Sequence, residues 1–275
     1  DWAQTTPEAG VPGGVHEVVY NGTDVITGLD FGNAESTAWA SAFGESTGNP
    51  GDGVNAVAVD ATGAVYAVGT RYGFGDLANT TGRSFIRKYA PGGDLLWENA
   101  LSPSTASHAS DVAIDGQGDV YFSGSFLGTN IDFDPRLTHG DSSDIMSSSG
   151  SYDAFLLKLD SNGDFIWVEG FGGGSAGEWD YSYGLAIDDS DNVYMSGSFS
   201  STADFDHGDT QPGDVDQLTS NGLTDGFIVK VDAAGDFQWV WGAGGTDRDS
   251  TLGLAVDSVG NVHAGGVFYN SVDFD

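Results

Sequence analysis

Short runs of β-branched and aromatic residues alternate along the chain with clusters of Gly, Asp, Asn and Ser. One such pattern occurs four times. The copies read VAVDATGAVYAVG from Val57, VAIDGQGDVYFSG from Val112, LAIDDSDNVYMSG from Leu185 and LAVDSVGNVHAGG from Leu254. Runs of this length bounded by turn-forming residues are typical of β-strands. Each copy therefore predicts two strands joined by a tight turn, and we find no pattern that predicts a long amphipathic helix.

A second pattern follows each of the first three copies and predicts two further strands. It reads SFIRKYAPGGDLLWENAL from Ser84, AFLLKLDSNGDFIWVEGFGG from Ala154 and GFIVKVDAAGDFQWVWGAGG from Gly226. A weaker copy lies near the start, as VVYNGTDVITGLDF from Val18 and AWASAFG from Ala38. Within the strong copies, one position always holds a lysine and another a tryptophan: Lys88, Lys158 and Lys230, and Trp97, Trp167 and Trp239.

The two predicted turns of each unit repeat a residue that tolerates a positive φ. The first turn has Gly63, Gly118 and Gly260 at one position, where Asp191 replaces glycine in the third copy. The second turn has Gly93, Gly163 and Gly235 in the same role. Glycine adopts positive φ freely and aspartate tolerates it, so both turns are predicted to join antiparallel neighbours.

Four antiparallel strands per unit, repeated, predict an all-β fold of the β-propeller type, with about four blades, as part of a larger ring or a longer chain. We assign one domain over 1–275, with units at approximately 15–49, 54–103, 111–174 and 183–245 and a partial unit at 254–275. The alternative is a β-helix, whose repeats are usually shorter and more uniform. The long connections at 127–152 and 200–224 fit propeller loops better.

The order D-x-x-G-N-V-Y-x-x-G-S-F, then D-F-D, then D-A-F-x-x-K-L-D-x-N-G and finally W-x-x-x-F-G-G resembles the SBBP family of bacterial and archaeal β-propeller repeats. The resemblance covers roughly residues 15 to 275 and is closest in the units that start near Asp111 and Tyr183. It implies a secreted or cell-surface propeller that is often one module of a larger protein. The final unit, with only its first two strands, also suggests a piece of a longer chain.

Composition narrows the possible partners. Acidic residues number 41 and basic residues 8, which gives a formal charge of −33 and argues against nucleic acid and anionic membrane surfaces as partners. No apolar run is long enough to predict membrane insertion. Cysteine is absent, which excludes disulfides, zinc-thiolate sites and thiol nucleophiles. Two interpretations of the charge stay open: an acidic coat suited to a salty habitat, or carboxylates that divalent cations neutralise.

The triplet Asp-Phe-Asp occurs three times, at Asp132–Asp134, Asp204–Asp206 and Asp273–Asp275, always on the predicted long-loop face. Strand alternation predicts that the central phenylalanine points inward and both carboxylates outward. Other carboxylates share these loops, and hard oxygen donors suit Ca²⁺. The predicted calcium ligands are Asp132, Asp134, Asp141, Asp144, Asp204, Asp206, Asp209, Asp214, Asp216, Asp273 and Asp275. The alternative is that these aspartates only cap turns through their own backbone.

The repeated lysines and tryptophans invite a structural interpretation. The fixed register of the lysines predicts a recurring partner, and the repeated aspartate of the first strand in the same blade fits that role; a ring of lysines around a channel is the alternative. The tryptophans are predicted to cover the seam between blades, with sugar stacking as the alternative. Trp179, Tyr181 and Tyr183 lie in a connection and predict an exposed aromatic patch for carbohydrate or protein.

Catalysis is the less favoured interpretation. Asp132 with Asp134, or Asp204 with Asp206, would have to act as an acid and a base, yet a single active site has no need of a repeated pair. We therefore expect a non-catalytic extracellular module that is structural, adhesive or binding, with a protein or polysaccharide partner at the cell surface. Exposed sheet edges would also allow self-association into a fibre. The alternative is a polysaccharide hydrolase or lyase with its site on the long-loop face.

Overall fold

Repeated four-stranded sheets make up the described part of the chain. The computed structural model describes residues 53–72, 82–101, 106–134, 136, 142–174, 177, 179–206, 216–272 and 274. These residues form three four-stranded antiparallel sheets, one two-stranded sheet and two short two-stranded ribbons. An all-β structure built from four-stranded antiparallel units is therefore confirmed, while the described elements do not close into a ring.

Each complete sheet uses its strands in the order of the chain. The first contains β1 (Gly53–Val59), β2 (Val65–Tyr72), β3 (Gly82–Tyr89) and β4 (Leu95–Ala100). The second contains β5 (Ala106–Ile114), β6 (Val120–Leu127), β9 (Asp153–Leu159) and β10 (Phe165–Phe171). The third contains β11 (Tyr181–Ile187), β12 (Val193–Phe199), β15 (Asp225–Val231) and β16 (Phe237–Ala243). The fourth is β17 (Ser250–Val256) paired with β18 (Val262–Val267).

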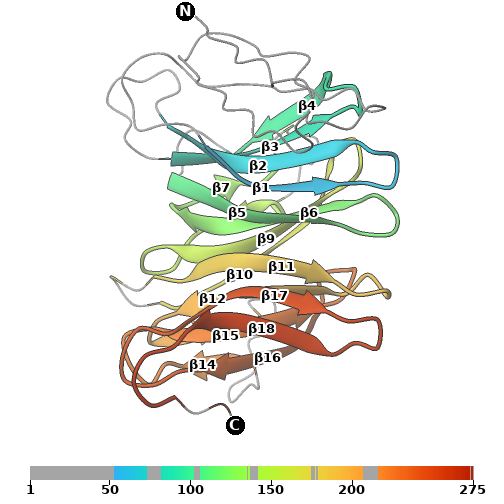
Figure 1. The fold of residues 1–275 in the computed structure, drawn as a ribbon. Helices are drawn as coiled ribbons and strands as arrows, with labels where there is room; N and C mark the ends of the chain where they lie inside the picture. Colours follow the sequence, from blue (N-terminus) through green and yellow to red (C-terminus); the bar gives the residue numbers. More distant parts are fainter. Residues whose placement is uncertain are drawn as a thin grey trace, which may run out of the picture.

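The four sheets stack on one another in chain order, from the blue β1 to the red β18 (Figure 1). The first strand of each later sheet packs on the face of the sheet before it, so that β5 contacts β1, β2 and β3, and β17 contacts β11, β12 and β15. We call the three junctions the first, second and third seam. No helix in the described part of the chain is long and apolar enough to cross a membrane.

The predicted turn geometry is confirmed. In the first turn of each unit φ is +84° at Gly63, +88° at Gly118, +60° at Asp191 and +86° at Gly260. The aspartate that opens the turn also closes it: Asp60 accepts hydrogen bonds at Oδ1 from the backbone N–H of Thr62 (2.9 Å) and of Ala64 (3.0 Å). Each repeated aspartate thus fixes the turn that starts the next strand.

A glycine in the second strand lets an aromatic ring lie against the sheet. A Cβ on Gly124 would lie 2.5 Å from the Phe155 ring and would also collide with the carbonyl oxygen of His108. Gly197 has the same relation to Phe227, and Gly69 to Phe85. The pattern V-Y-x-x-G therefore records a place where only glycine fits, because protein interiors have no spare volume for an added methyl group.

The Asp-Phe-Asp segments form the short ribbons, β7 (Ile131–Asp132) with β8 (Ile145–Met146) and β13 (Thr202–Asp204) with β14 (Gln217–Thr219). Phe133 and Phe205 are 0% and 1% exposed, which confirms the inward orientation of the phenylalanines. Phe133 packs edge-on against Phe126 and Phe155. The third triplet differs, because Phe274 is 55% exposed.

The expectation that both flanking carboxylates point outward is wrong for the second carboxylate of the first copy. Asp134 is buried, since the chain turns after β7 instead of continuing as a strand. Two residues later, Arg136 forms an ion pair with Asp164 of the tight β9–β10 turn (2.9 Å). The segment therefore runs along the sheet toward the opposite rim. The Asp204 segment adds backbone hydrogen bonds in both directions with Gly172, at the end of β10 in the preceding sheet (3.0 and 3.1 Å). The second triplet thus helps to close the second seam.

Replacing Phe133 or Phe205 with alanine is expected to lower the free energy of unfolding by about 3–5 kcal/mol, because each leaves a cavity among buried rings. Phe274→Ala is the matched control: it alters the same triplet at an exposed position and should change stability by less than about 0.5 kcal/mol. Urea denaturation followed by tryptophan fluorescence measures all three. Equal losses at the three positions would contradict the burial described above.

Candidate functional site

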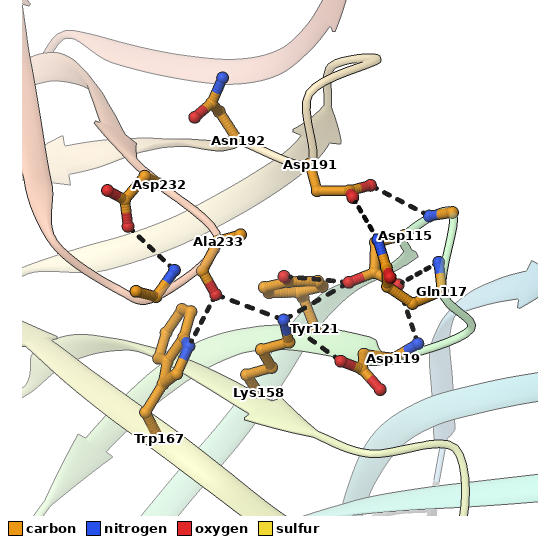
Figure 2. Close-up of polar contacts among 12 residues, drawn as sticks. Asp115, Gln117, Asp119, Tyr121, Lys158, Trp167, Asp191, Asn192, Asp232 and Ala233 are labelled. Carbon is orange, nitrogen blue, oxygen red and sulfur yellow. Dashed lines mark hydrogen bonds and ion pairs between the residues drawn. The ribbon is translucent and has the colours of Figure 1, made fainter.

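A lysine near the end of the third strand joins the first sheet to the second and the second to the third, as Lys158 shows in Figure 2. Lys158 Nζ lies 3.5 Å from Asp115 Oδ2 and 3.3 Å from Asp119 Oδ2 in its own sheet. It also donates a hydrogen bond to the carbonyl oxygen of Ala233 in the following sheet (3.3 Å). The ammonium lies 4.8 Å from the centre of the Tyr121 ring, which adds a cation–π contact. One cation thus neutralises a buried carboxylate and crosses the seam.

The same lysine contacts recur in the other two complete sheets, which confirms the predicted pairing of lysine with the repeated aspartate. Lys88 Nζ is 3.8 Å from Asp60 Oδ2, and Lys230 Nζ is 3.5 Å from Asp188 Oδ2. Tyr66 and Tyr194 each place a ring 4.8 Å from the corresponding ammonium. Burial and the negative charge of Asp115 raise the pKa of Tyr121 far above its ordinary value, so this tyrosine stays neutral and donates to Asp115 (3.2 Å).

Two of the three repeated tryptophans, Trp97 and Trp167, cover the seams as predicted. Trp97 Nε1 donates to the carbonyl oxygen of Ser161 (3.3 Å), the atom that also accepts from Lys88 (2.9 Å). Trp167 Nε1 donates in the same way to Ala233 (3.2 Å; Figure 2). A Cβ on Gly163 or Gly235 would press on these indoles. Trp239 is 37% exposed, and the next sheet has two strands within the described residues.

Asp191 forms a second link across the second seam, from turn to turn. Its Oδ1 accepts from the backbone N–H of Gly116 (3.1 Å) and its Oδ2 from the side-chain amide of Gln117 (2.7 Å; Figure 2). Asp191 is the residue that replaces glycine at the positive-φ position of the turn. The substitution therefore places a residue with a Cβ at a positive φ, which is less favourable than glycine there, but gains a carboxylate that binds the neighbouring sheet.

Removing the amine of Lys158 is expected to destabilise the protein strongly. In Lys158→Met the Asp115 side chain, 1% exposed, loses its cationic partner, which predicts a loss of about 3–5 kcal/mol. Lys230→Met is the control at the third sheet, where the pair is more exposed and the loss should be smaller. Adding Asp115→Asn to Lys158→Met should recover part of the loss in urea denaturation. No recovery would show that the lysine acts through its alkyl packing alone.

The Asp-Phe-Asp carboxylates cap their own turns. Asp132 Oδ1 accepts from the backbone N–H of Asp134 (2.8 Å), and Asp204 Oδ1 accepts from that of Asp206 (2.9 Å). The turn-capping alternative is therefore confirmed at these two positions. Capping leaves lone pairs available on each carboxylate, so a role in calcium binding stays a prediction.

The predicted calcium ligands fall into two local groups. Asp144 lies beside the first triplet, where its carbonyl oxygen accepts from the N–H of Phe133 (2.8 Å), and Asp216 bears the same relation to Phe205 (3.0 Å). Burial, with the charges of Asp144 and Asp134, raises the pKa of Asp132. Within the described residues no set of three or more His, Asp or Glu side chains is placed to hold a metal ion. Five predicted ligands lie outside the described residues: Asp141, Asp209, Asp214, Asp273 and Asp275.

Glu169 is a chemically distinctive residue that the repeat pattern did not indicate. Burial raises its pKa to about 7, and the negative charges of Asp206 and Asp236 act in the same direction. It lies in β10, two residues after Trp167, where the other sheets have Asn99 and Trp241. The signal in the sequence was a lone acid at a position that is otherwise uncharged.

The titration of Glu169 predicts how stability changes with pH. Because its folded pKa exceeds its ordinary value of 4.5, the folded state binds more protons between pH 4.5 and 7, and stability falls as pH rises through this window. Glu169→Gln removes this penalty. In EDTA at pH 8 the variant should be more stable than wild type by about 2–3 kcal/mol, with almost no difference at pH 4. Asp189→Asn, at an exposed carboxylate, controls for net charge; a difference for Glu169→Gln that does not change with pH would contradict the assignment.

The predicted aromatic patch lies beside the second seam. Trp179 is 48% exposed, and its backbone N–H donates to Ser200 Oγ (2.8 Å). Tyr181 lies 5.9 Å from Tyr152 between ring centres, and Tyr152 lies 5.8 Å from His108, so the rings form a row that the sequence pattern did not show. Tyr183 is only partly exposed and its hydroxyl lies 3.3 Å from Ser198 Oγ, which makes it part of the sheet surface below the row.

Comparisons with known proteins indicate a repeated β-structure. No protein-family profile matches the chain. An uncharacterized WD repeat-containing protein, L264, of Acanthamoeba polyphaga mimivirus is 24% identical over 160 residues, which cover 53% of this chain and 11% of the viral protein. A protein of unknown function from Bacteroides caccae aligns with 76% of this chain and 86% of its own, at 10% identity and a TM-score of 0.25. The WD-repeat likeness and the repeated four-stranded sheets together support a propeller-like repeat protein.

Proposed function

We propose that the chain is part of a β-propeller of the SBBP type and serves as a non-catalytic structural, adhesive or binding module of an extracellular or cell-surface assembly. The observation that carries this proposal is the recurrence of one seam chemistry. Lysine, tyrosine, aspartate and tryptophan return in the same arrangement at successive sheets, and most of their polar atoms bind each other or the next sheet. Chemistry that repeats with the fold favours a scaffold over a single active site.

The ligand surface that this proposal favours is the exposed Trp179, whose backbone pairs with that of Tyr152 in the aromatic row. An exposed indole offers a flat apolar face with a polar edge, which suits sugar rings and protein surfaces. We favour a neutral or basic polysaccharide or protein, because the formal charge of −33 repels polyanions. Calcium bound at the Asp-Phe-Asp loops would stiffen the module, as oxygen ligands in extracellular modules do.

A polysaccharide hydrolase is the second candidate, and one observation favours it. Glu169 has a pKa of about 7, which is the range of a general acid, and Asp206 lies close enough to influence it. The position of Glu169 within a seam argues against it, since its counterpart Asn99 holds the seam together by donating to the carbonyl oxygen of Gly163 (2.7 Å). Substrate would have to reach a residue that is largely covered by the neighbouring sheet.

Affinity electrophoresis on gels containing neutral polysaccharides tests the proposal. Wild type should be retarded by at least one polysaccharide, Trp179→Ala should lose the retardation at unchanged stability, and Trp239→Ala, which removes an exposed tryptophan elsewhere, should keep it. Reducing ends are assayed in parallel and none should be released. Release of reducing ends that Glu169→Gln abolishes would overturn the non-catalytic assignment in favour of the hydrolase.

A further inference from the structure

A pair of buried aspartates lies at the third seam, outside both the lysine contacts and the Asp-Phe-Asp loops. Asp225 begins β15, and Asp249 directly precedes β17; they are 3% and 0% exposed. The Asp225 carboxylate lies against the Cα of Gly244, so that any side chain at this glycine would collide with it. Burial raises the pKa of Asp225, and the negative charge of Asp249 contributes to the rise.

One oxygen of this pair has no hydrogen-bond partner. Asp249 accepts from the N–H of Gly245 at Oδ2 and from that of Tyr269 at Oδ1, both at 2.7 Å. Asp225 accepts from the N–H of Asn221 at Oδ2 (2.9 Å), while its buried Oδ1 has no partner. Neither carboxylate forms an ion pair with a basic side chain of the described residues. A buried carboxylate oxygen without a partner carries a free-energy cost that a bound cation removes.

The pair lies directly behind the wall of an open hollow. An open hollow of about 400 Å³ is lined by Asn221, Gly244, Gly245, Thr246, Ser271 and Val272. Asn221 donates to Asp225, Gly244 contacts the same carboxylate, and Gly245 donates to Asp249. The two carboxylates therefore stand one residue behind this wall, and an ion reaches them past Asn221, Gly244 and Gly245, whose amide and carbonyl oxygens are donors that Ca²⁺ accepts.

The second seam repeats this arrangement at equivalent positions. Asp153 begins β9 and Asp180 directly precedes β11. Asp153 Oδ1 and Asp180 Oδ2 lie 2.8 and 2.9 Å from the position that a Cβ on Gly172 would take, so both carboxylates face one small volume. As at the third seam, the carboxylate of the incoming strand is anchored by a backbone amide, here that of Gly173 (3.0 Å).

At the first seam both aspartates are replaced, and one of the replacing residues is an arginine. Arg83 takes the place of Asp153, because each stands two residues before the buried phenylalanine of the third strand. Ser107 takes the place of Asp180, because each stands two residues before the residue that pairs with the repeated glycine of the second strand. The Arg83 guanidinium donates to the carbonyl oxygen of Leu101 from Nη2 (3.0 Å) and Nε (3.3 Å). Positive charge is therefore built into this position where the two carboxylates are missing.

We propose that the Asp225–Asp249 pair and the Asp153–Asp180 pair each bind one calcium ion, which supplies the positive charge that Arg83 supplies at the first seam. Two carboxylates balance the charge of a divalent cation, and carbonyl oxygens and water complete a coordination shell of six to eight oxygens. These sites staple neighbouring sheets together, because each pair takes one aspartate from either side of a seam. The third-seam site lies outside the ligand surface and the Asp-Phe-Asp loops, whereas the second-seam site adjoins both, because Asp180 follows Trp179 and Gly172 pairs with Asp204.

Equilibrium dialysis with radioactive calcium and thermal melts of the 275-residue chain test the proposal. Wild type should bind at least two ions at about 5 mM Ca²⁺, and each occupied site should raise Tm by about 3–5 °C over EDTA at tenfold excess over Kd. Asp153→Asn with Asp225→Asn should bind two fewer ions and lose the matching part of the Tm rise, at an unchanged or higher Tm in EDTA. Asp189→Asn, at an exposed carboxylate, should behave as wild type.

A variant that copies the first seam provides an independent result. Asp225→Arg with Asp249→Ser should bind one ion fewer than wild type and show a smaller calcium-dependent rise in Tm. The proposal is overturned by a wild-type chain that binds no calcium at this concentration. It is also overturned by a folded Asp153→Asn/Asp225→Asn variant with full stoichiometry. Loss of all binding in Asp132→Asn/Asp204→Asn alone would assign the calcium to the Asp-Phe-Asp loops, overturning the seam sites and leaving the proposed function intact.

Discussion

The contact on which the rest of the structure depends is a lysine that binds an aspartate in its own sheet and reaches a turn of the next. The chain has eight basic residues and 41 acidic ones, and three of the eight occupy this one repeated position. Two of them, Lys88 and Lys158, donate to a backbone carbonyl across a seam. Because sheets of one net charge repel each other, contacts that place positive charge between them decide whether the stack holds. The tryptophans share the same carbonyl acceptors and exclude water from them.

The fold could be predicted where the contacts of a residue all lie within one repeat unit. Strand pairing, the positive φ at the turns and the pairing of Lys158 with Asp115 all lie within one unit, so a repeated residue implies a repeated neighbour. The burial of Phe133 and Phe205 could be predicted from strand alternation, because the phenylalanine and its two neighbouring aspartates are expected on opposite faces of a strand. The repeat thus predicted which residues would be neighbours in the folded chain.

Features that depend on two units at once were not predictable in this way. Asp134 was expected to be exposed and is buried, because the segment after β7 turns along the sheet surface. Glu169 has an ordinary appearance in the sequence, and its raised pKa comes from burial at a seam and from acids of the following unit. Asp225 and Asp249 stand 24 positions apart on different sheets, and no spacing rule joins them. What a residue does at a seam depends on which side chain the next unit presents.

The comparison of the three seams explains how one repeat can tolerate substitutions in its polar contacts. The first seam uses Arg83 where the others use aspartates, and the second uses Asp191 where other turns use glycine. Each change keeps the sheets in contact while altering the charge between them. Native-state hydrogen exchange tests most directly whether the seams couple the sheets. We predict that β6, β9, β12 and β15 exchange at one common free energy, as a single cooperative unit. Separate free energies for each sheet would contradict the conclusion that the lysine contacts hold the stack together.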